Sequence, residues 1–237
     1  DHYRRFFAEA PPGALVGEKS ADYLADPQVP GRIAELLPEV RLVAQLRDPV
    51  ARAYSDYKML FRRGQATGMP ADYLANPDNP QPRFLRDGLY GHHLKRWLDW
   101  FPRDALLIFL FEEVAMNSRD VVERTSRHIG VEPFFDPKLA RRKQNNSEER
   151  LIPRPLRTVL APFKGAVEPF RGNAVFEFAR DKLARPIEYP PLAPDLERRM
   201  RDFYRKDIEE LESLFGIDLD RWKEPECSNG LKLTHKG

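Results

Sequence analysis

The stretch Leu42–Tyr57, LVAQLRDPVARAYSDY, carries the strongest indication of how this chain folds. It starts inside a nearly continuous apolar run, Arg41–Leu46, and continues beyond it. Such a run is typical of a strand that is buried on both faces. Asp48 is a favourable N-cap and Pro49 a favourable first residue of a helix, which should then extend to about Arg63. The stretch therefore predicts a buried strand that turns directly into a helix.

The regions on either side continue this alternation. A second buried strand is expected at Leu106–Phe111, LLIFLF, and a short strand at Ala14–Gly17, ALVG. Helices with start or stop signals are expected at Gly31–Leu37, at Asn117–His128 with Asn117 as N-cap and Gly130 beyond its end, and at Asp195–Phe215 before Gly216. Strands that alternate with helices predict an α/β fold with a parallel sheet flanked by helices.

Two helices should each bury one apolar face, because their apolar residues recur at helical spacing. These faces consist of Tyr90, Leu94, Trp97, Leu98 and Phe101, and of Leu196, Met200, Phe203, Leu211 and Leu214. Gly64–Pro82 is rich in Gly, Pro, Asn and Asp and is expected to be a surface loop. We expect one domain over residues 1–222 and a tail over residues 223–237.

The composition is ordinary for a globular protein. The 237 residues are 41% hydrophobic and 32% charged, and the formal net charge is +2. This small net charge gives no reason to expect a nucleic acid partner. The sequence contains no apolar run long enough to span a membrane and no recognisable signal peptide. The single cysteine, Cys227, excludes an internal disulfide, and we expect a cytoplasmic protein.

Arg47 and Ser55 form the candidate binding pair. Arg47 leaves the strand at its carboxyl end, which is where ligands bind to parallel sheets. Ser55 follows Asp48 by nearly two helical turns, so both lie on one face of the helix. A planar cation, a hydroxyl donor and a helix N-terminus together suit a phosphate monoester. A plain strand-to-helix turn, with Arg47 in a structural ion pair, is the alternative interpretation.

Several segments together resemble one enzyme family. They are GEKSADYL (17–24), RDPVARAYSDY (47–57), GLYGHHLKRWLDWFP (88–102), LIFLFEEV (107–114) and FYRKDIEELESLFGIDLDRW (203–222). In this order they are similar to elements of sulfotransferases that use 3′-phosphoadenosine 5′-phosphosulfate (PAPS), especially the heparan-sulfate and bacterial Golgi-type branch. The run RDPVARAYSDY resembles that family's 3′-phosphate motif. The resemblance covers roughly residues 13–222 and implies a P-loop-like sulfotransferase fold.

The resemblance also implies roles for individual residues. Arg47 and Ser55 would bind the 3′-phosphate of PAPS. Lys19 would lie on the acceptor side, near the transferred sulfuryl group; an ordinary surface lysine is the alternative, and Ala21 stands where the family usually has proline. Arg142 and Lys143, in a basic loop, would contact the 5′-phosphosulfate side, with a merely solvated loop as the alternative.

The family's glycine-rich strand–loop–helix for the 5′-phosphosulfate is absent from this sequence, and so is the Walker form GxxxxGK[ST]. We expect this first strand and loop, together with the catalytic base, to precede Asp1. No His, Cys and Asp cluster has zinc spacing, and we expect no metal.

The implied function is transfer of a sulfuryl group from PAPS to a hydroxyl or amine of a small-molecule or saccharide acceptor. Positioning and charge stabilisation would supply most of the catalysis. Two other classes are compatible with the residues: a nucleotide kinase-like phosphotransferase and a non-catalytic nucleotide-binding remnant. Magnesium-dependent ATP turnover would favour the first, and binding of adenosine 3′,5′-bisphosphate without any sulfated product would favour the second.

Overall fold

The computed structural model describes residues 3–78, 83–140 and 187–224 of the chain. Within these ranges the sheet has two parallel strands, β1 (Leu42–Leu46) and β2 (Leu106–Leu110). The pairing sets Leu42 opposite Leu106 and Leu46 opposite Leu110, so both strands end at the same edge. The two long strands expected from the sequence are confirmed.

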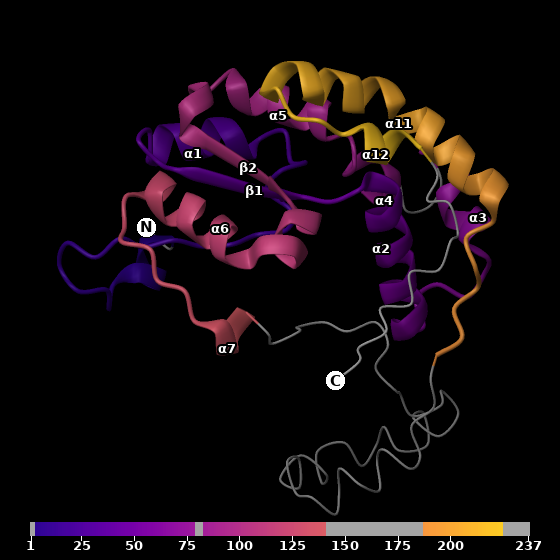
Figure 1. Cartoon of the computed structure of the whole chain (residues 1–237), viewed down its shortest axis with the longest axis horizontal. Coiled ribbons are helices and arrows are strands. Elements are labelled where there is room, and N and C mark those ends of the chain that lie inside the picture. Colours follow the sequence, from indigo (N-terminus) through magenta and orange to yellow (C-terminus); the bar gives the residue numbers. More distant parts are fainter. Residues whose placement is uncertain (1–2, 79–82, 141–186, 225–237) are drawn as a thin grey trace, which may run out of the picture.

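Helices lie on both sides of this sheet. Figure 1 shows α1 (Val29–Leu36), α5 (Tyr90–Leu98) and α11 (Pro194–Phe215) above it, and α6 (Phe111–Ile129) below it. The expected α/β fold with a parallel sheet flanked by helices is therefore confirmed. The remaining elements are η1 (Tyr3–Phe7), α2 (Pro49–Arg63), α3 (Pro70–Leu74), α4 (Arg83–Arg86), η2 (Arg103–Ala105), α7 (Pro137–Ala140) and α12 (Asp220–Lys223).

Helix α2 begins and ends at the expected residues. Asp48 Oδ1 accepts hydrogen bonds from the N–H groups of Val50 at 2.8 Å and Ala51 at 3.1 Å, which satisfies two of the free donors at the helix start. Pro49 occupies the first turn, where its missing N–H costs nothing. Gly64 ends the helix with a φ of 82°, in the left-handed region that glycine adopts without strain.

Helices α5 and α11 approach each other at Gly91. A Cβ atom built on Gly91 would lie 2.4 Å from the carbonyl oxygen of Asp207, so only glycine fits there. The Asp207 carboxylate accepts from the N–H groups of Gly91 at 2.9 Å and His92 at 2.8 Å, and it thus caps α5 from a neighbouring helix. The close contact and the cap together fix the position of α5 on α11.

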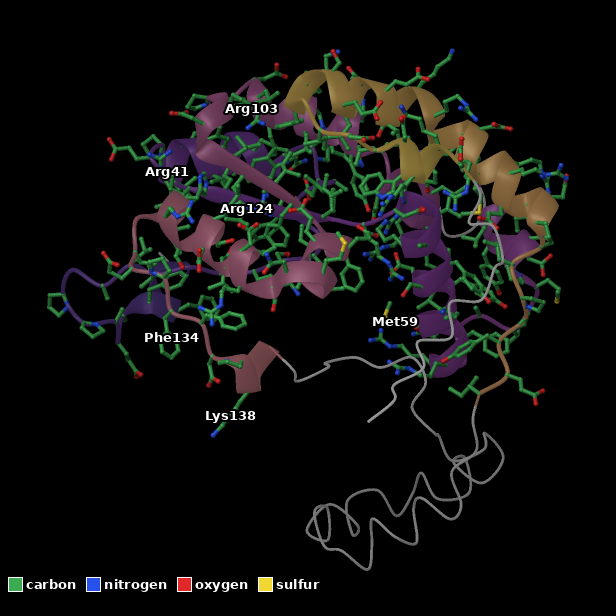
Figure 2. All side chains as sticks on the ribbon, in the orientation of Figure 1. Arg41, Met59, Arg103, Arg124, Phe134 and Lys138 are labelled. Atoms are coloured by element: carbon green, nitrogen blue, oxygen red, sulfur yellow. The ribbon has the colours of Figure 1, made fainter. Side chains whose placement is uncertain are left out.

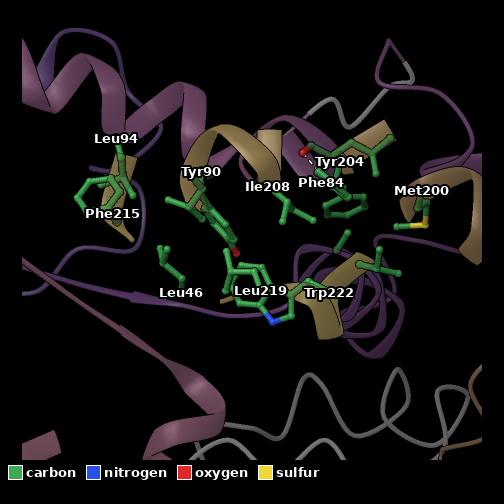
Figure 3. Close-up of a cluster of buried hydrophobic side chains, with 14 of the residues drawn as sticks. Leu46, Phe84, Tyr90, Leu94, Met200, Tyr204, Ile208, Phe215, Leu219 and Trp222 are labelled. Carbon is green, nitrogen blue, oxygen red and sulfur yellow. Dashed lines mark hydrogen bonds between the residues drawn. The ribbon is translucent and has the colours of Figure 1, made fainter. Parts of the chain in front are cut away.

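One hydrophobic core joins residues that are far apart in the sequence. Figure 3 shows Leu46 from the end of β1 near Tyr90 of α5 and Trp222 of α12. The ring centres of Tyr90 and Trp222 lie 6.1 Å apart. All three side chains are buried, so the end of β1 is closed on one side by α5 and α12.

Two expectations about strands are wrong. Ala14–Gly17 forms no strand: Leu15 and Val16 are 62% and 46% exposed, and the segment has no ladder partner within the described residues. Strand β1 is buried on one face only, because Val43 is 41% exposed and Gln45 is also exposed. Since side chains alternate along a strand, the residues between them face the core, while α6 covers the other face incompletely.

Helix α6 differs in part from the expected Asn117–His128. Asn117 does act as a cap, since its Oδ1 accepts from the Asp120 N–H at 3.2 Å, and Gly130 ends the helix at a φ of 79°. An additional helical segment precedes this cap and begins at Phe111. Asn117 separates the two segments with a non-helical φ of −148° and ψ of 72°.

Two further regions, the segment after α2 and the buried face of α11, differ from what the sequence predicts. Gly64–Pro82 contains helix α3, whose Leu74 is buried, so this region is more than a surface loop. On α11, Phe203 is 36% exposed, while the neighbouring Tyr204 is fully buried together with the charged Arg201. None of the helices in the described parts combines the length and the apolar character needed to cross a membrane.

Candidate functional site

The two strand ends bring Arg47 and Phe111 together. They directly follow Leu46 and Leu110, which are opposite each other in the parallel pairing. The guanidinium carbon of Arg47 lies 5.0 Å from the centre of the Phe111 ring, a cation–π distance. The ring is 46% exposed, so the pair lies at the surface of the carboxyl edge. Phe111 thus orients the arginine fork without neutralising its charge.

Asp48, and not Arg47, forms the structural ion pair of this turn. Asp48 Oδ2 lies 3.1 Å from Arg201 Nη1, and both side chains are almost fully buried. Arg47 makes no ion pair with a carboxylate within the described residues. Among residues 3–78, 83–140 and 187–224, the alternative interpretation of Arg47 as an ion-paired structural residue therefore finds no support.

Neighbouring residues hold the backbone on both sides of Arg47. Tyr90 is buried beside this turn: burial raises its pKa to about 12, while the Arg52 guanidinium and the Arg47 backbone act in the opposite direction. A Cβ atom on Gly88 would lie 3.1 Å from Pro49 and 2.9 Å from Tyr204, so glycine lets α2 pack closely at this point. The turn is positioned before any ligand arrives.

Ser55 lies on α2, two turns beyond Asp48, and its side chain is half-buried. Met59 is one turn further on the same helix face, and Figure 2 shows Met59 on the side of α2 that faces α6. Ser55 lies one turn before Met59, near the same face of α2. The hydroxyl can reach a ligand there because no partner occupies it within the described residues.

The charged neighbours of Ser55 are engaged with each other. Arg52 Nη1 lies 2.7 Å from Asp56 Oδ2, and Arg52 Nη2 donates to the Phe84 carbonyl at 2.6 Å. Burial raises the pKa of Asp56, while the nearby Arg52, Arg83 and Arg47 act in the opposite direction. Arg52 thus takes the carboxylate that could otherwise compete for Arg47.

Lys19 is exposed, and it makes no hydrogen bond or ion pair with the described residues. The chain just after it is anchored: Arg96 Nη2 donates to the Ala25 carbonyl at 2.9 Å and Trp97 Nε1 to the Leu24 carbonyl at 3.2 Å. The structure does not bring Lys19 into contact with Arg47 or Ser55. Arg142 and Lys143 lie outside the described residues.

Phe111 and Arg201 were not foreseen from the sequence. Phe111 could have been found, because two parallel strands that end together place their next residues side by side. Arg201 could not, because it interrupts an apolar helix face and its partner Asp48 lies 153 positions away. Only the folded chain shows that the charge is compensated.

One acidic cluster in the described parts has a geometry that could suit a cation, namely Glu212, Asp218 and Asp220. The ammonium group of Lys223 already lies 2.6 Å from Glu212 Oε2 and 2.9 Å from Asp220 Oδ1. The lysine thus supplies the positive charge for this cluster. It belongs to the α11–α12 packing rather than to the strand ends.

The fold is an α/β fold in which Arg47 and Phe111 lie together at the carboxyl edge of a parallel sheet. Arg47 and the start of α2 lie at this edge, and Ser55 follows along the same helix. A guanidinium, a hydroxyl and a helix N-terminus are groups that suit a phosphate monoester.

Comparisons with known proteins identify the class. No family model matches the sequence. The chain is 33% identical over 129 residues to human bifunctional heparan sulfate N-deacetylase/N-sulfotransferase 2, a match of 50% of this chain and 15% of the relative. It is 27% identical over 135 residues to human heparan sulfate glucosamine 3-O-sulfotransferase 6, covering 54% and 39% of the two chains.

A solved structure extends the similarity to nearly the whole chain. The crystal structure of a sulfotransferase from Alicyclobacillus acidocaldarius matches with a TM-score of 0.67 and 25% identity, over 94% of this chain and 73% of that chain. The chain is thus similar to sulfotransferases both in sequence and in fold. It spans only 15% of the length of the human N-deacetylase/N-sulfotransferase.

Proposed function

We propose that this protein transfers a sulfuryl group from PAPS to a hydroxyl or amine of an acceptor. The carrying observation is Arg47, a strand-end arginine with no carboxylate partner in the described residues, set against Phe111 in a chain that is similar to sulfotransferases. PAPS, when bound, supplies the sulfuryl group, and adenosine 3′,5′-bisphosphate remains as product.

Arg47 and Ser55 would hold the 3′-phosphate of this nucleotide. The planar guanidinium can donate two parallel hydrogen bonds to phosphate oxygens, and the Ser55 hydroxyl can donate a third. The N-terminus of α2 adds partial positive charge to the same place. Since the buried ion pair of Asp48 and Arg201 fixes the turn beforehand, little ordering would accompany binding.

Lys19, Arg142 and Lys143 extend the proposal to the sulfuryl side. Lys19 would lie near the acceptor, and Arg142 and Lys143 near the 5′-phosphosulfate. We expect no metal ion to take part. A cytoplasmic location, and a single domain over residues 1–222, stay predictions.

The acceptor that we propose is a saccharide. The names of the matching human proteins describe N-sulfation and glucosamine 3-O-sulfation of heparan sulfate, so the family includes enzymes that act on saccharide amines and hydroxyls. Mass spectrometry of an amine-bearing and a hydroxyl-only oligosaccharide after incubation with PAPS would test this class. A gain of one sulfuryl group is the expected product, and a small-molecule acceptor would be indicated if neither saccharide gains one.

The nucleotide assignment is tested by Arg47→Ala. Loss of a charge-assisted contact should weaken binding of adenosine 3′,5′-bisphosphate by about 2 kcal/mol, or roughly 30-fold, in isothermal titration calorimetry. Arg41→Ala is the control, because Arg41 is an exposed arginine at the opposite end of β1 that donates to the Asp104 carbonyl at 3.3 Å. Unchanged affinity in the Arg47 variant would refute the assignment.

A further inference from the structure

Arg201 of α11 is buried beside the turn that carries Arg47. Its side chain is 4% exposed, and Nη1 donates to Asp48 Oδ2 at 3.1 Å and to the Trp222 carbonyl at 2.9 Å. Its Nε and Nη2 atoms donate to Glu197 Oε1 at 3.2 and 2.8 Å. One guanidinium thus connects α11, α12 and the N-cap of α2.

Asp48 is an unfavourable neighbour for an anion site unless its charge is compensated. It is adjacent to Arg47 in the chain, and its burial limits screening by water and salt. An uncompensated carboxylate there would repel a phosphate, and it would also attract the Arg47 guanidinium. In the structure its Oδ1 is used by the N–H groups of Val50 and Ala51, and its Oδ2 by Arg201.

We infer that Arg201 is a positioning residue for nucleotide binding, which neutralises Asp48 and thereby leaves the Arg47 guanidinium free for the 3′-phosphate. The inference rests on the proposed function of Arg47. Arg201 lies in the core behind the turn and touches no ligand; it acts through Asp48. Its contribution should therefore depend on the 3′-phosphate and not on the rest of the nucleotide.

The experiment compares two probes on the full-length protein by isothermal titration calorimetry. They are adenosine 3′,5′-bisphosphate and adenosine 5′-monophosphate, which lacks the 3′-phosphate, and the ratio of their dissociation constants isolates that group. Arg201→Met leaves Asp48 and Glu197 without their shared cation. The preference for the bisphosphate should fall about tenfold, as expected for one added unit of poorly screened negative charge.

A double variant separates the charge of Arg201 from its packing. Asp48→Asn combined with Arg201→Met removes one carboxylate together with the cation, so the net charge of the cluster returns to the wild-type value. Asparagine still caps α2, and the one carboxylate that loses Arg201, Glu197, is partly exposed to solvent at 23%. The preference for the bisphosphate should recover to within about twofold of wild type, because Arg47 again has no competing carboxylate.

Arg205→Met is the matched control. Arg205 follows Arg201 by one turn of α11, is 48% exposed and pairs with Asp202 at 3.3 Å, away from the turn. Its replacement should leave both affinities unchanged. If Arg201→Met does not fold, Arg201→Gln gives the same test, since its amide keeps a donor for Asp48 but carries no charge.

Each result has a definite meaning. If Arg201→Met weakens both nucleotides equally, or the double variant keeps the defect, Arg201 acts only through packing and the inference is wrong. A selective loss that the double variant restores supports it. Failure of the proposed function looks different, because the wild-type protein would then show no preference for the bisphosphate, or Arg47→Ala would not remove it.

Discussion

The two strand exits of the sheet are held in different ways. After β1, the cap residue Asp48 is paired with Arg201, and the side chains are 11% and 4% exposed. After β2, Glu113 accepts from the Leu110 N–H at 3.1 Å and pairs with Arg124 of the same helix, with about a third of each side chain exposed. Figure 2 shows Arg124 on α6, beneath the sheet. The first exit is fixed by distant helices, and the second by its own helix.

This difference indicates that the backbone after β1 is held more rigidly than the backbone after β2. A guanidinium that must meet a phosphate benefits from a backbone fixed by buried contacts, because less motion is then lost on binding. The β2 exit supplies only the face of Phe111, and an aromatic face tolerates small displacements better than a two-point hydrogen bond does. The more rigid β1 exit therefore carries the charged Arg47, and the less rigid β2 exit supplies Phe111, which packs against it.

The largest expected effect comes from removing the two carboxylates in turn. Asp48→Ala should lower the free energy of unfolding by about 4 kcal/mol, because it removes a cap and leaves buried Arg201 without one partner. Glu113→Ala should lower it by about 1 kcal/mol, because its ion pair is partly solvated. Urea unfolding followed by circular dichroism measures both. Similar losses for the two variants would contradict the comparison.

A second test addresses the packing of α5 against α11, the two helices that lie next to the β1 exit. Gly91→Ala should cost about 3 kcal/mol of unfolding free energy, since its Cβ would lie 2.4 Å from the Asp207 carbonyl oxygen and force α5 away from α11. Gly17→Ala, in the exposed segment, meets no atom within 4 Å and should change stability by less than about 0.5 kcal/mol. A thermal melt of both variants distinguishes a packed region from an open one.

The smallest effect concerns pH and the packed region. The Nε2 atom of His93 donates to the Arg86 carbonyl at 2.8 Å, and its Nδ1 atom accepts from Arg96 Nη2 at 2.8 Å. Burial is the main cause that lowers the pKa of His93 to about 4, and Arg96, His92 and Arg52 act in the same direction. A lowered folded-state pKa means that the unfolded chain binds the proton more readily. This stabilisation is present above the unfolded pKa of 6.5 and is lost as pH falls toward 4.

Between pH 7 and pH 5 this histidine should account for a loss of about 2 kcal/mol of unfolding free energy. Denaturation curves of wild type and His93→Gln at several pH values measure this loss. The variant should lack this part of the pH dependence of the unfolding free energy, which is the slope that we compare. His92→Gln is the control: the adjacent side chain is exposed and is only a minor cause of the lowered His93 pKa, so most of the wild-type slope should remain. Equal slopes in wild type and the His93 variant would exclude this role.

Local signals in the sequence predicted what depends on neighbouring residues. The strand, the Asp48 cap and Pro49 all act within one turn, and they correctly placed α2 and the position of Arg47. The same reasoning failed for Ala14–Gly17 and for the second face of β1. Strand formation and burial require partners from elsewhere in the chain, which local preference does not specify.

The amino-acid order alone determined the helix start at Asp48–Pro49, the glycine stops at Gly64, Gly130 and Gly216, and the resemblance of these elements to sulfotransferases. Only the tertiary structure decided that Asp48 pairs with Arg201 and that Arg47 meets Phe111 instead of a carboxylate. Caps and turns are short-range hydrogen bonds that the neighbouring sequence fixes. The partner of a buried charge is set by whichever distant helix packs against it, and that becomes defined only when the chain is folded.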